Sequence, residues 1–213
     1  MIVKVCGMSE AENIRAVDGL SVDLMGFIFW PKSSRYVSER PSYLPIHCKR
    51  VGVFVDADIR EVQQKVEEYG LDYIQLHGHE TPDYIRQLRA VDGLPVDTRL
   101  IKAISISSRD DIATYKNYEG LVDYFLFDTK AQLPGGNGQQ FDWSVLADYN
   151  GTTPFLLSGG IGPDDAERLR DCHCSPCFST GLCAGIDLNS RFEVAPALKD
   201  INKLKEFIKK VRI

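Results

Sequence analysis

The sequence lacks any apolar run close to the ~20 residues that a membrane-spanning helix requires. Its N-terminus also lacks a positively charged stretch followed by an apolar one, which is the pattern of a secretory signal peptide. These two absences argue against a membrane partner and lead us to expect a cytoplasmic protein.

An excess of charge of one sign is also missing. The 25 Lys and Arg residues are set against 30 Asp and Glu residues, which gives a net charge of −5, and both signs are spread along the chain. A nucleic-acid-binding surface needs clustered Lys and Arg. The charge pattern therefore argues against a nucleic-acid partner.

The cysteines do not form the paired spacing of a zinc site. Cys6 and Cys48 are isolated, whereas four cysteines gather around His173, namely Cys172, Cys174, Cys177 and Cys183. This cluster has no second C-x2-C half to complete a ligand set, although a zinc site can be imagined there. Because thiols stay reduced in the cytosol, free cysteines are the favoured interpretation and no metal is predicted.

What the 213 residues do contain is a regular alternation of short apolar runs and amphipathic stretches. The apolar runs predict strands at Ile2–Cys6, Leu24–Phe29, Arg50–Val55, Tyr73–Leu76, Leu100–Ile104, Val122–Phe127, Pro154–Leu157 and Leu182–Leu188. The stretches between and after them predict helices at Glu10–Val17, Ile59–Tyr69, Pro82–Arg89, Asp110–Lys116, Trp143–Tyr149, Asp164–Arg170 and Ile201–Val211. The weakest helix candidate lies between Ser38 and Cys48, where two prolines interrupt it.

Strands that alternate with helices indicate a parallel sheet, and strands that are apolar throughout indicate a sheet covered on both faces. Eight such units predict an α/β fold, a (β/α)8 TIM barrel, as a single domain over residues 1–213. An open, doubly wound sheet is the structural alternative, since the distinction depends on the strand count.

A (β/α)8 barrel carries its active site at the carboxyl ends of the strands. Cys6 ends the first strand and is either a small buried residue or, as a thiolate, a base or nucleophile. Asp128 ends the sixth strand and either acts as an acid or caps the following loop. Arg35 follows the second strand; a surface role is its simplest interpretation, although its planar fork suits a carboxylate. His77, after the fourth strand, is the least specific of these residues.

The seventh strand runs into Gly159 and Gly160, and a helix follows. Adjacent glycines allow a backbone to approach an anion closely, and a helix N-terminus adds partial positive charge. A tight turn with glycine for steric reasons is the alternative. We favour a phosphate site, because barrels often bind phosphate after strands seven and eight, where Ser190 adds a donor.

Together these segments resemble the phosphoribosylanthranilate isomerase family of tryptophan biosynthesis. The matching stretches cover nearly the whole chain in order: KVCGM (Lys4–Met8), GFIFWPKSSRY (Gly26–Tyr36), VGVFV (Val51–Val55), IQLHG (Ile74–Gly78), LFDTK (Leu126–Lys130), GGNGQQFDW (Gly135–Trp143), LLSGGIGPDDA (Leu156–Ala166), GIDLNS (Gly185–Ser190) and ALKD (Ala197–Asp200). The resemblance implies an Amadori rearrangement of N-(5-phosphoribosyl)anthranilate to 1-(2-carboxyphenylamino)-1-deoxyribulose 5-phosphate. It implies a small phosphorylated substrate, no cofactor, and a monomer or a homodimer.

The resemblance also implies roles for individual residues. Cys6 matches the general base and Asp128 the general acid, while Arg35 matches the residue that holds the anthranilate carboxylate. The phosphate-binding loops of the family match Gly159, Gly160, Asn189 and Ser190. Asp187 matches an aspartate that contacts or orients the sugar. As the base, Cys6 is expected to be a thiolate with a lowered pKa, for which the helix start after Gly7 is one candidate cause.

The chain departs from the family after the eighth strand, where Asn189-Ser190-Arg191 stands in place of a Ser-Ser-Gly run. Arg191 cannot adopt a positive φ as cheaply as glycine, so we expect a different turn there, with Arg191 paired either to the phosphate or to Glu193.

Two other functions stay open at this point. One is an epimerase or synthase of the same fold, which would carry a catalytic lysine or metal ligands at the strand ends. The other is a barrel that only binds a sugar phosphate.

Overall fold

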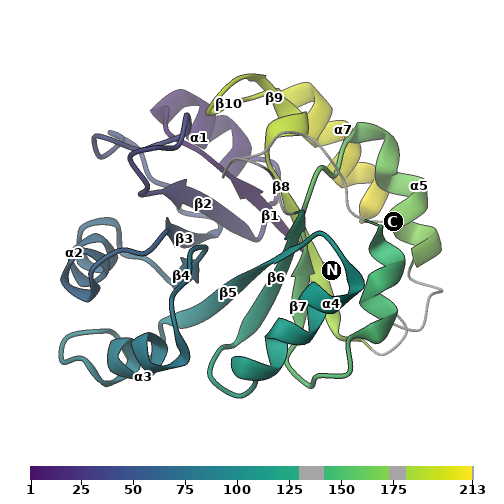
Figure 1. Cartoon of the computed structure of the whole chain (residues 1–213). Helices are drawn as coiled ribbons and strands as arrows, with labels where there is room; N and C mark the ends of the chain where they lie inside the picture. Colours follow the sequence, from purple (N-terminus) through teal and green to yellow (C-terminus); the bar gives the residue numbers. More distant parts are fainter. Residues whose placement is uncertain (130–141, 173–180, 213) are drawn as a thin grey trace.

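The computed structural model describes residues 1–129, 142–172 and 181–212. Within them, eight parallel strands close into a barrel in the order β1 to β8, and helices surround it (Figure 1). The strands are β1 (Ile2–Cys6), β2 (Leu24–Ile28), β3 (Lys49–Phe54), β4 (Tyr73–Leu76), β5 (Arg99–Ile106), β6 (Tyr124–Thr129), β7 (Phe155–Leu157) and β8 (Cys183–Leu188). The closed barrel confirms the predicted (β/α)8 fold and sets the open sheet aside.

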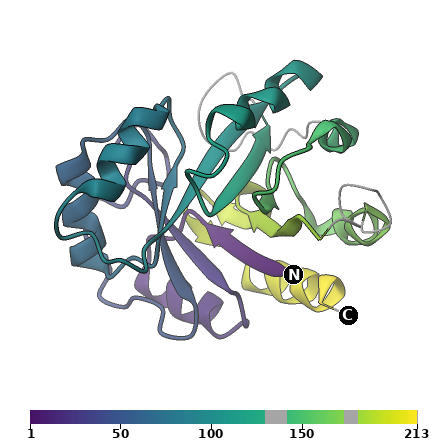
Figure 2. The same ribbon diagram turned by 90° about the horizontal axis from the view of Figure 1, so that it is seen from below.

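The helices lie outside the barrel wall, as the view from below shows (Figure 2). They are α1 (Ala11–Asp18), α2 (Ile59–Tyr69), α3 (Pro82–Ala90), α4 (Arg109–Ile112), α5 (Ala166–Cys172) and α7 (Ile201–Val211). Local signals fix several boundaries. The Asp58 side chain accepts a hydrogen bond from the Arg60 amide at the start of α2, and Gly70 ends that helix in the left-handed conformation at φ +58°.

Three predicted helices differ from the structure. The segment 38–48, which is fully described, contains no helix, in keeping with its two prolines. Residues Trp143–Asp148 form a 3₁₀ helix, and α4 is a single turn that passes into a second 3₁₀ helix at Ala113–Asn117. Further 3₁₀ turns at Pro163–Asp165 and Ser190–Phe192 follow β7 and β8. A small antiparallel pair, β9 (Glu193–Ala195) and β10 (Leu198–Lys199), precedes α7.

Side chains alternate across each barrel strand, and this alternation builds two cores. One apolar layer lies between the strands and the helices and includes Val3 and Val5 of β1. A smaller cluster fills the barrel interior: Leu24, Val51, Tyr73, Ile101, Ala103, Leu126 and Leu156. Toward the carboxyl ends of the strands the inward positions become polar, with Cys6, Asp128 and Asp187 at the cavity. The apolar cluster fills the barrel interior beneath them.

None of the helices in the described residues combines the length and the apolar character that a membrane crossing requires.

Candidate active site

A cavity opens at the carboxyl ends of the strands. It is lined by seven of the residues predicted from the sequence: Cys6, Asp128, Gly159, Gly160, Asp187, Asn189 and Ser190. The two-residue period explains why these side chains meet. Val5, Phe127 and Ile186 belong to the outer core, so the neighbouring Cys6, Asp128 and Asp187 face inward.

Cys6 is buried, with 3% of its surface exposed, and β2 makes room for its thiol. A Cβ at Gly26 would stand only 2.7 Å from Cys6 Sγ, so glycine is required at this point of the neighbouring strand. Lys4, two residues earlier on β1, faces the same interior. Its ammonium pairs with Asp187 Oδ1 at 2.8 Å, because Lys4 and Asp187 are direct partners in the β1–β8 ladder.

Burial raises the pKa of the Cys6 thiol above its ordinary value, while the cations of Lys4 and Lys199 act in the opposite direction. The direction of this pKa shift is therefore opposite to the expected lowering. Helix α1 begins at Ala11, with Glu10 as its N-cap, and not directly after Gly7. The groups that favour the thiolate are the two lysine ammoniums.

Asp128 stands at the cavity with about a quarter of its side chain exposed, 26%. Its Oδ1 accepts a hydrogen bond from the Thr129 amide at 2.9 Å, and its Oδ2 lies 3.4 Å from His77 Nε2. The Gln75 amide nitrogen lies 2.8 Å from His77 Nδ1. With that nitrogen donating, the ring proton resides on Nε2 and faces the Asp128 carboxylate. His77, the least specific candidate in the sequence, thus contacts Asp128 at the cavity.

Arg35 is buried beside the cavity but is absent from its lining. Its Nε and Nη2 donate to the two oxygens of Glu193 at 2.8 and 2.7 Å. Lys199 holds the same carboxylate and also donates to Asn189 Oδ1 at 2.8 Å. These pairings lower the pKa of Glu193 even though burial opposes them. Glu193, one of the two partners considered for Arg191, therefore pairs with Arg35 and Lys199.

The turn after β7 has a backbone conformation that favours glycine. Gly159 and Gly160 both have positive φ, +87° and +69°. A Cβ at Gly159 would overlap the Thr129 hydroxyl, so this turn packs against the end of β6. Gly162 then caps the turn that leads into α5, and its amide donates to Asp165 Oδ2 at 2.7 Å.

Arg191 lies in the 3₁₀ turn after β8, and it is not among the residues of positive φ. A Cβ at Gly162 would stand 3.1 Å from Arg191 Nε. The Arg191 side chain accordingly lies over the start of the turn that leads into α5.

Sequence reasoning missed the charged residues that support this site, namely Lys4, Lys199 and Glu193. For Lys4 a signal was present, because a residue two positions before Cys6 on one strand must share its face. Lys199 and Glu193 come from the short β9–β10 pair, which carries no pattern long enough to predict. Several sequence features lie outside the described residues: Lys130, the glycine loop at Gly135, Gly136 and Gly138, and His173, Cys174 and Cys177.

Fold and site together define a (β/α)8-barrel enzyme with titratable groups at the carboxyl ends of its strands. Comparison with known proteins narrows this class. A family model described as N-(5'-phosphoribosyl)anthranilate (PRA) isomerase matches residues 3–210. The N-(5'-phosphoribosyl)anthranilate isomerase of Phocaeicola vulgatus is 50% identical over 212 residues, covering 100% of this chain and 98% of that protein. The chain therefore belongs to the PRA isomerase family and is an isomerase.

Solved structures agree. The phosphoribosyl anthranilate isomerase of Thermotoga maritima has a TM-score of 0.80 and 30% identity, with 100% of this chain and 99% of that one covered. A second PRA isomerase structure has a TM-score of 0.77 and 27% identity over 100% and 99% of the two chains. That protein is in complex with reduced 1-(o-carboxyphenylamino)-1-deoxyribulose 5-phosphate. Family membership sets aside the epimerase or synthase and the binding-only barrel.

Proposed function

We propose that the protein converts N-(5-phosphoribosyl)anthranilate to 1-(2-carboxyphenylamino)-1-deoxyribulose 5-phosphate in tryptophan biosynthesis. One observation carries the proposal. A thiol from β1 and a carboxyl from β6 line the same cavity, next to a left-handed glycine turn after β7. An aldose–ketose rearrangement of a sugar phosphate needs these three features, an acid, a base and an anchor for the phosphate.

Asp128 acts first, as the general acid. It protonates the furanose ring oxygen as the C1–O bond breaks, while the anthranilate nitrogen donates its lone pair to C1. The products are a free hydroxyl at C4 and a protonated Schiff base. The contact with His77 Nε2 at 3.4 Å and the Thr129 amide hold the carboxyl group in place for this transfer.

Cys6 acts second, as the general base. The protonated C=N bond acidifies the proton on ribose C2, and the Cys6 thiolate removes it to give an enolamine. The enolamine then gains a proton at C1 and loses one from the C2 hydroxyl, so the product is an isomer of the substrate. Lys4 and Lys199 favour the thiolate against the cost of its burial.

The two anions of the substrate are held at different points of the rim. The phosphate is held by the backbone at Gly159–Gly160 and by the loop at Asn189 and Ser190, all on the cavity. The anthranilate carboxylate is held by Arg35. Glu193 accepts hydrogen bonds from the Arg35 Nε and Nη2 atoms. The remaining nitrogen, Nη1, donates to Ser34 Oγ at 3.4 Å, and it is the atom that would donate to the substrate carboxylate.

We further propose that the enzyme works without a cofactor in the cytoplasm, as a monomer or a homodimer. The function is tested with the purified protein and N-(5-phosphoribosyl)anthranilate. Turnover consumes the substrate with a fall in anthranilate fluorescence, and NMR shows a ketone carbon in the product. A folded protein that binds inorganic phosphate but leaves the substrate unchanged over hours would overturn the proposal.

A further inference from the structure

Another buried ion pair lies on the helix-facing side of the barrel wall, away from the cavity. Lys102 Nζ and Glu80 Oε2 are 2.9 Å apart, with 3% and 1% of their side chains exposed. Ile101 and Ala103 face the barrel interior, so Lys102 between them faces the helices. Neither residue lines the cavity, and the chemistry proposed above does not use them.

The two residues of this pair form hydrogen bonds with the backbone on both sides of His77. Lys102 Nζ donates to the carbonyls of Leu76 and Gly78 at 3.3 and 2.7 Å, as well as to Glu80. The Glu80 carboxylate in turn accepts hydrogen bonds from the Gly78 amide at 3.0 and 3.1 Å. The residues before and after His77 are thus tied to one buried ammonium and one buried carboxylate.

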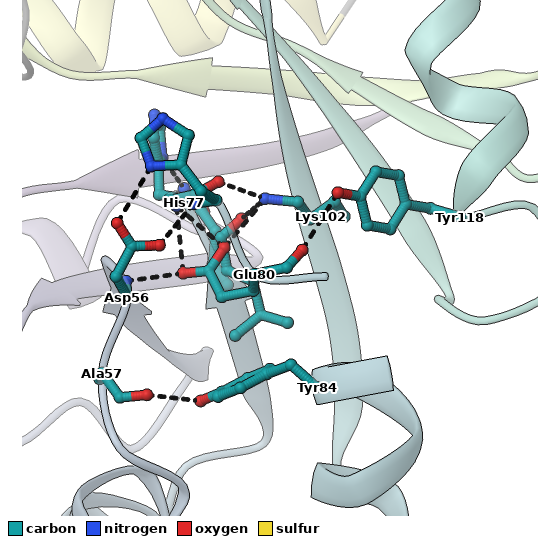
Figure 3. A network of polar contacts seen from close by, with 11 residues as sticks. Asp56, Ala57, His77, Glu80, Tyr84, Lys102 and Tyr118 are labelled. Atoms are coloured by element: carbon teal, nitrogen blue, oxygen red, sulfur yellow. Dashed lines mark hydrogen bonds and ion pairs between the residues drawn. The ribbon is translucent and has the colours of Figure 1, made fainter. Parts of the chain in front are cut away.

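The same carboxylate also joins the loop after β3 to the loop after β4. Glu80 Oε1 accepts a hydrogen bond from the Asp56 amide at 3.0 Å, and the Tyr118 hydroxyl donates to the Glu80 carbonyl at 3.1 Å. Figure 3 shows Glu80 between Asp56 on one side and Lys102 and Tyr118 on the other. The His77 amide is itself bonded to the carbonyl of Phe54 in β3 at 2.8 Å.

Stability alone does not explain this arrangement. A buried ion pair is costly to desolvate, and a well-packed apolar pair of similar volume commonly stabilises a fold as much or more. What an apolar pair cannot do is direct hydrogen bonds at chosen backbone groups. The benefit of the charges is therefore geometric, and the residue whose geometry they determine is His77.

We propose that Glu80 and Lys102 are positioning residues for the reaction, which act through His77 on Asp128. They fix the backbone around His77, Gln75 fixes its ring, and the ring holds Asp128 toward the substrate. This inference rests on the proposed function, because it concerns the acid step of that reaction. It adds two residues outside the cavity to those on which the acid step depends.

The first test compares two carboxylate-to-amide variants. Glu80→Gln weakens the hydrogen bonds that Glu80 makes with Lys102 and with the Gly78 and Asp56 amides near the active site. Asp18→Asn does the same at a distant loop, where the buried Asp18 accepts hydrogen bonds from the Tyr43 hydroxyl and the Ile46 and His47 amides. We expect kcat to fall about 10-fold to 100-fold in Glu80→Gln, with phosphate affinity unchanged, because small displacements of catalytic groups cost rates of this order. Asp18→Asn is expected to lose stability and to keep kcat.

A cycle of variants identifies the route of the effect. His77→Asn, Glu80→Gln and the double variant are compared by log kcat. If Glu80 acts through His77, the double variant is no slower than His77→Asn alone, whereas additive losses would contradict the proposal. If Glu80→Gln folds poorly, the double variant Lys102→Met with Glu80→Leu replaces the ion pair by an apolar pair. Its kcat is then measured, and we expect it to fall as in Glu80→Gln. Wild-type kcat in that folded variant, or in Glu80→Gln, would overturn the inference and leave the proposed function standing. An inactive wild-type protein would instead overturn the proposed function.

Discussion

Arg35 and Glu193 form a two-pronged ion pair between the loop after β2 and β9, 158 residues apart in the chain. The aliphatic part of the Arg35 side chain lies next to Gly7, where a Cβ would stand 2.7 Å from Arg35 Cδ. Lys199 also pairs with this carboxylate, at the Oε1 atom that accepts from Arg35 Nε. The position of the proposed carboxylate-binding arginine thus depends on a short strand pair near the C-terminus.

Arg35→Ala is expected to raise KM for the substrate roughly 30-fold or more, since loss of one partner of a buried charge pair costs ~2 kcal/mol or more. Glu193→Gln should raise KM by a smaller factor, because it loosens Arg35 without removing it. Arg109→Ala serves as the control, since Arg109 pairs with Asp148 at an exposed position. Unchanged KM and kcat in Arg35→Ala would remove this residue from the site.

Gly159→Ala is expected to weaken binding of inorganic phosphate at least ~10-fold and to lower Tm, because the new Cβ would press on Thr129 and demand a positive φ that costs ~1–2 kcal/mol. Gly120→Ala separates the two effects. Gly120 has φ +75°, and a Cβ added there would meet nothing within 4 Å, so this variant carries the backbone strain alone. Isothermal titration calorimetry measures the affinity of each variant for inorganic phosphate. Wild-type affinity in Gly159→Ala would show that the Gly159–Gly160 turn does not bind the phosphate.

The raised pKa of Cys6 has a direct chemical consequence. Only the thiolate reacts with iodoacetamide, and its fraction grows about tenfold per pH unit below the pKa. The rate of Cys6 alkylation, followed by peptide mass spectrometry, should therefore rise steadily from pH 7 to pH 9. Lys4→Met removes a cation that favours the thiolate and should slow the reaction at each pH. A rate independent of pH over this range would show that the thiol is already ionised.

Lys4→Met tests the buried pair with Asp187. It leaves Asp187 buried without its cation, which costs about 3–5 kcal/mol of unfolding free energy. Lys49→Met is the control, because Lys49 pairs with Asp72 while 66% of its side chain is exposed, and such pairs contribute about 0–1 kcal/mol. Urea unfolding measures both. Equal losses in the two variants would contradict the buried arrangement.

Local patterns predicted the elements whose signals are local. The bounds of β1, β4, α2 and α7 agree with the sequence-based ranges, since apolar periodicity and the Asp58 and Gly70 caps suffice to fix them. The 3₁₀ helix at Trp143–Asp148 shows the limit of this reasoning. The Asp142 side chain caps it by accepting a hydrogen bond from the Ser144 amide, and such a cap does not distinguish a 3₁₀ helix from an α-helix.

The candidate site was predictable where strand ends determine position. Cys6, Asp128 and Gly159 follow from the barrel topology once the strands are known. The supporting ion pairs were not predictable, because closure of the barrel joins residues far apart in sequence, and β9 and β10 are too short to carry a recognisable pattern. Lys4 meets Asp187 only through the β1–β8 register, and Lys102 of β5 meets Glu80, which follows β4, only because these two strands are neighbours in the barrel.

The central claim is that Cys6 and Asp128 are the base and the acid of one reaction. It is tested most directly by the turnover of Cys6→Ala and Asp128→Ala on N-(5-phosphoribosyl)anthranilate, followed by anthranilate fluorescence, with inorganic phosphate affinity measured on the same samples. We predict that each variant loses roughly 10²–10⁴-fold or more in kcat, as expected for an acid–base group, and binds phosphate like the wild type. Full turnover in either variant would contradict the account.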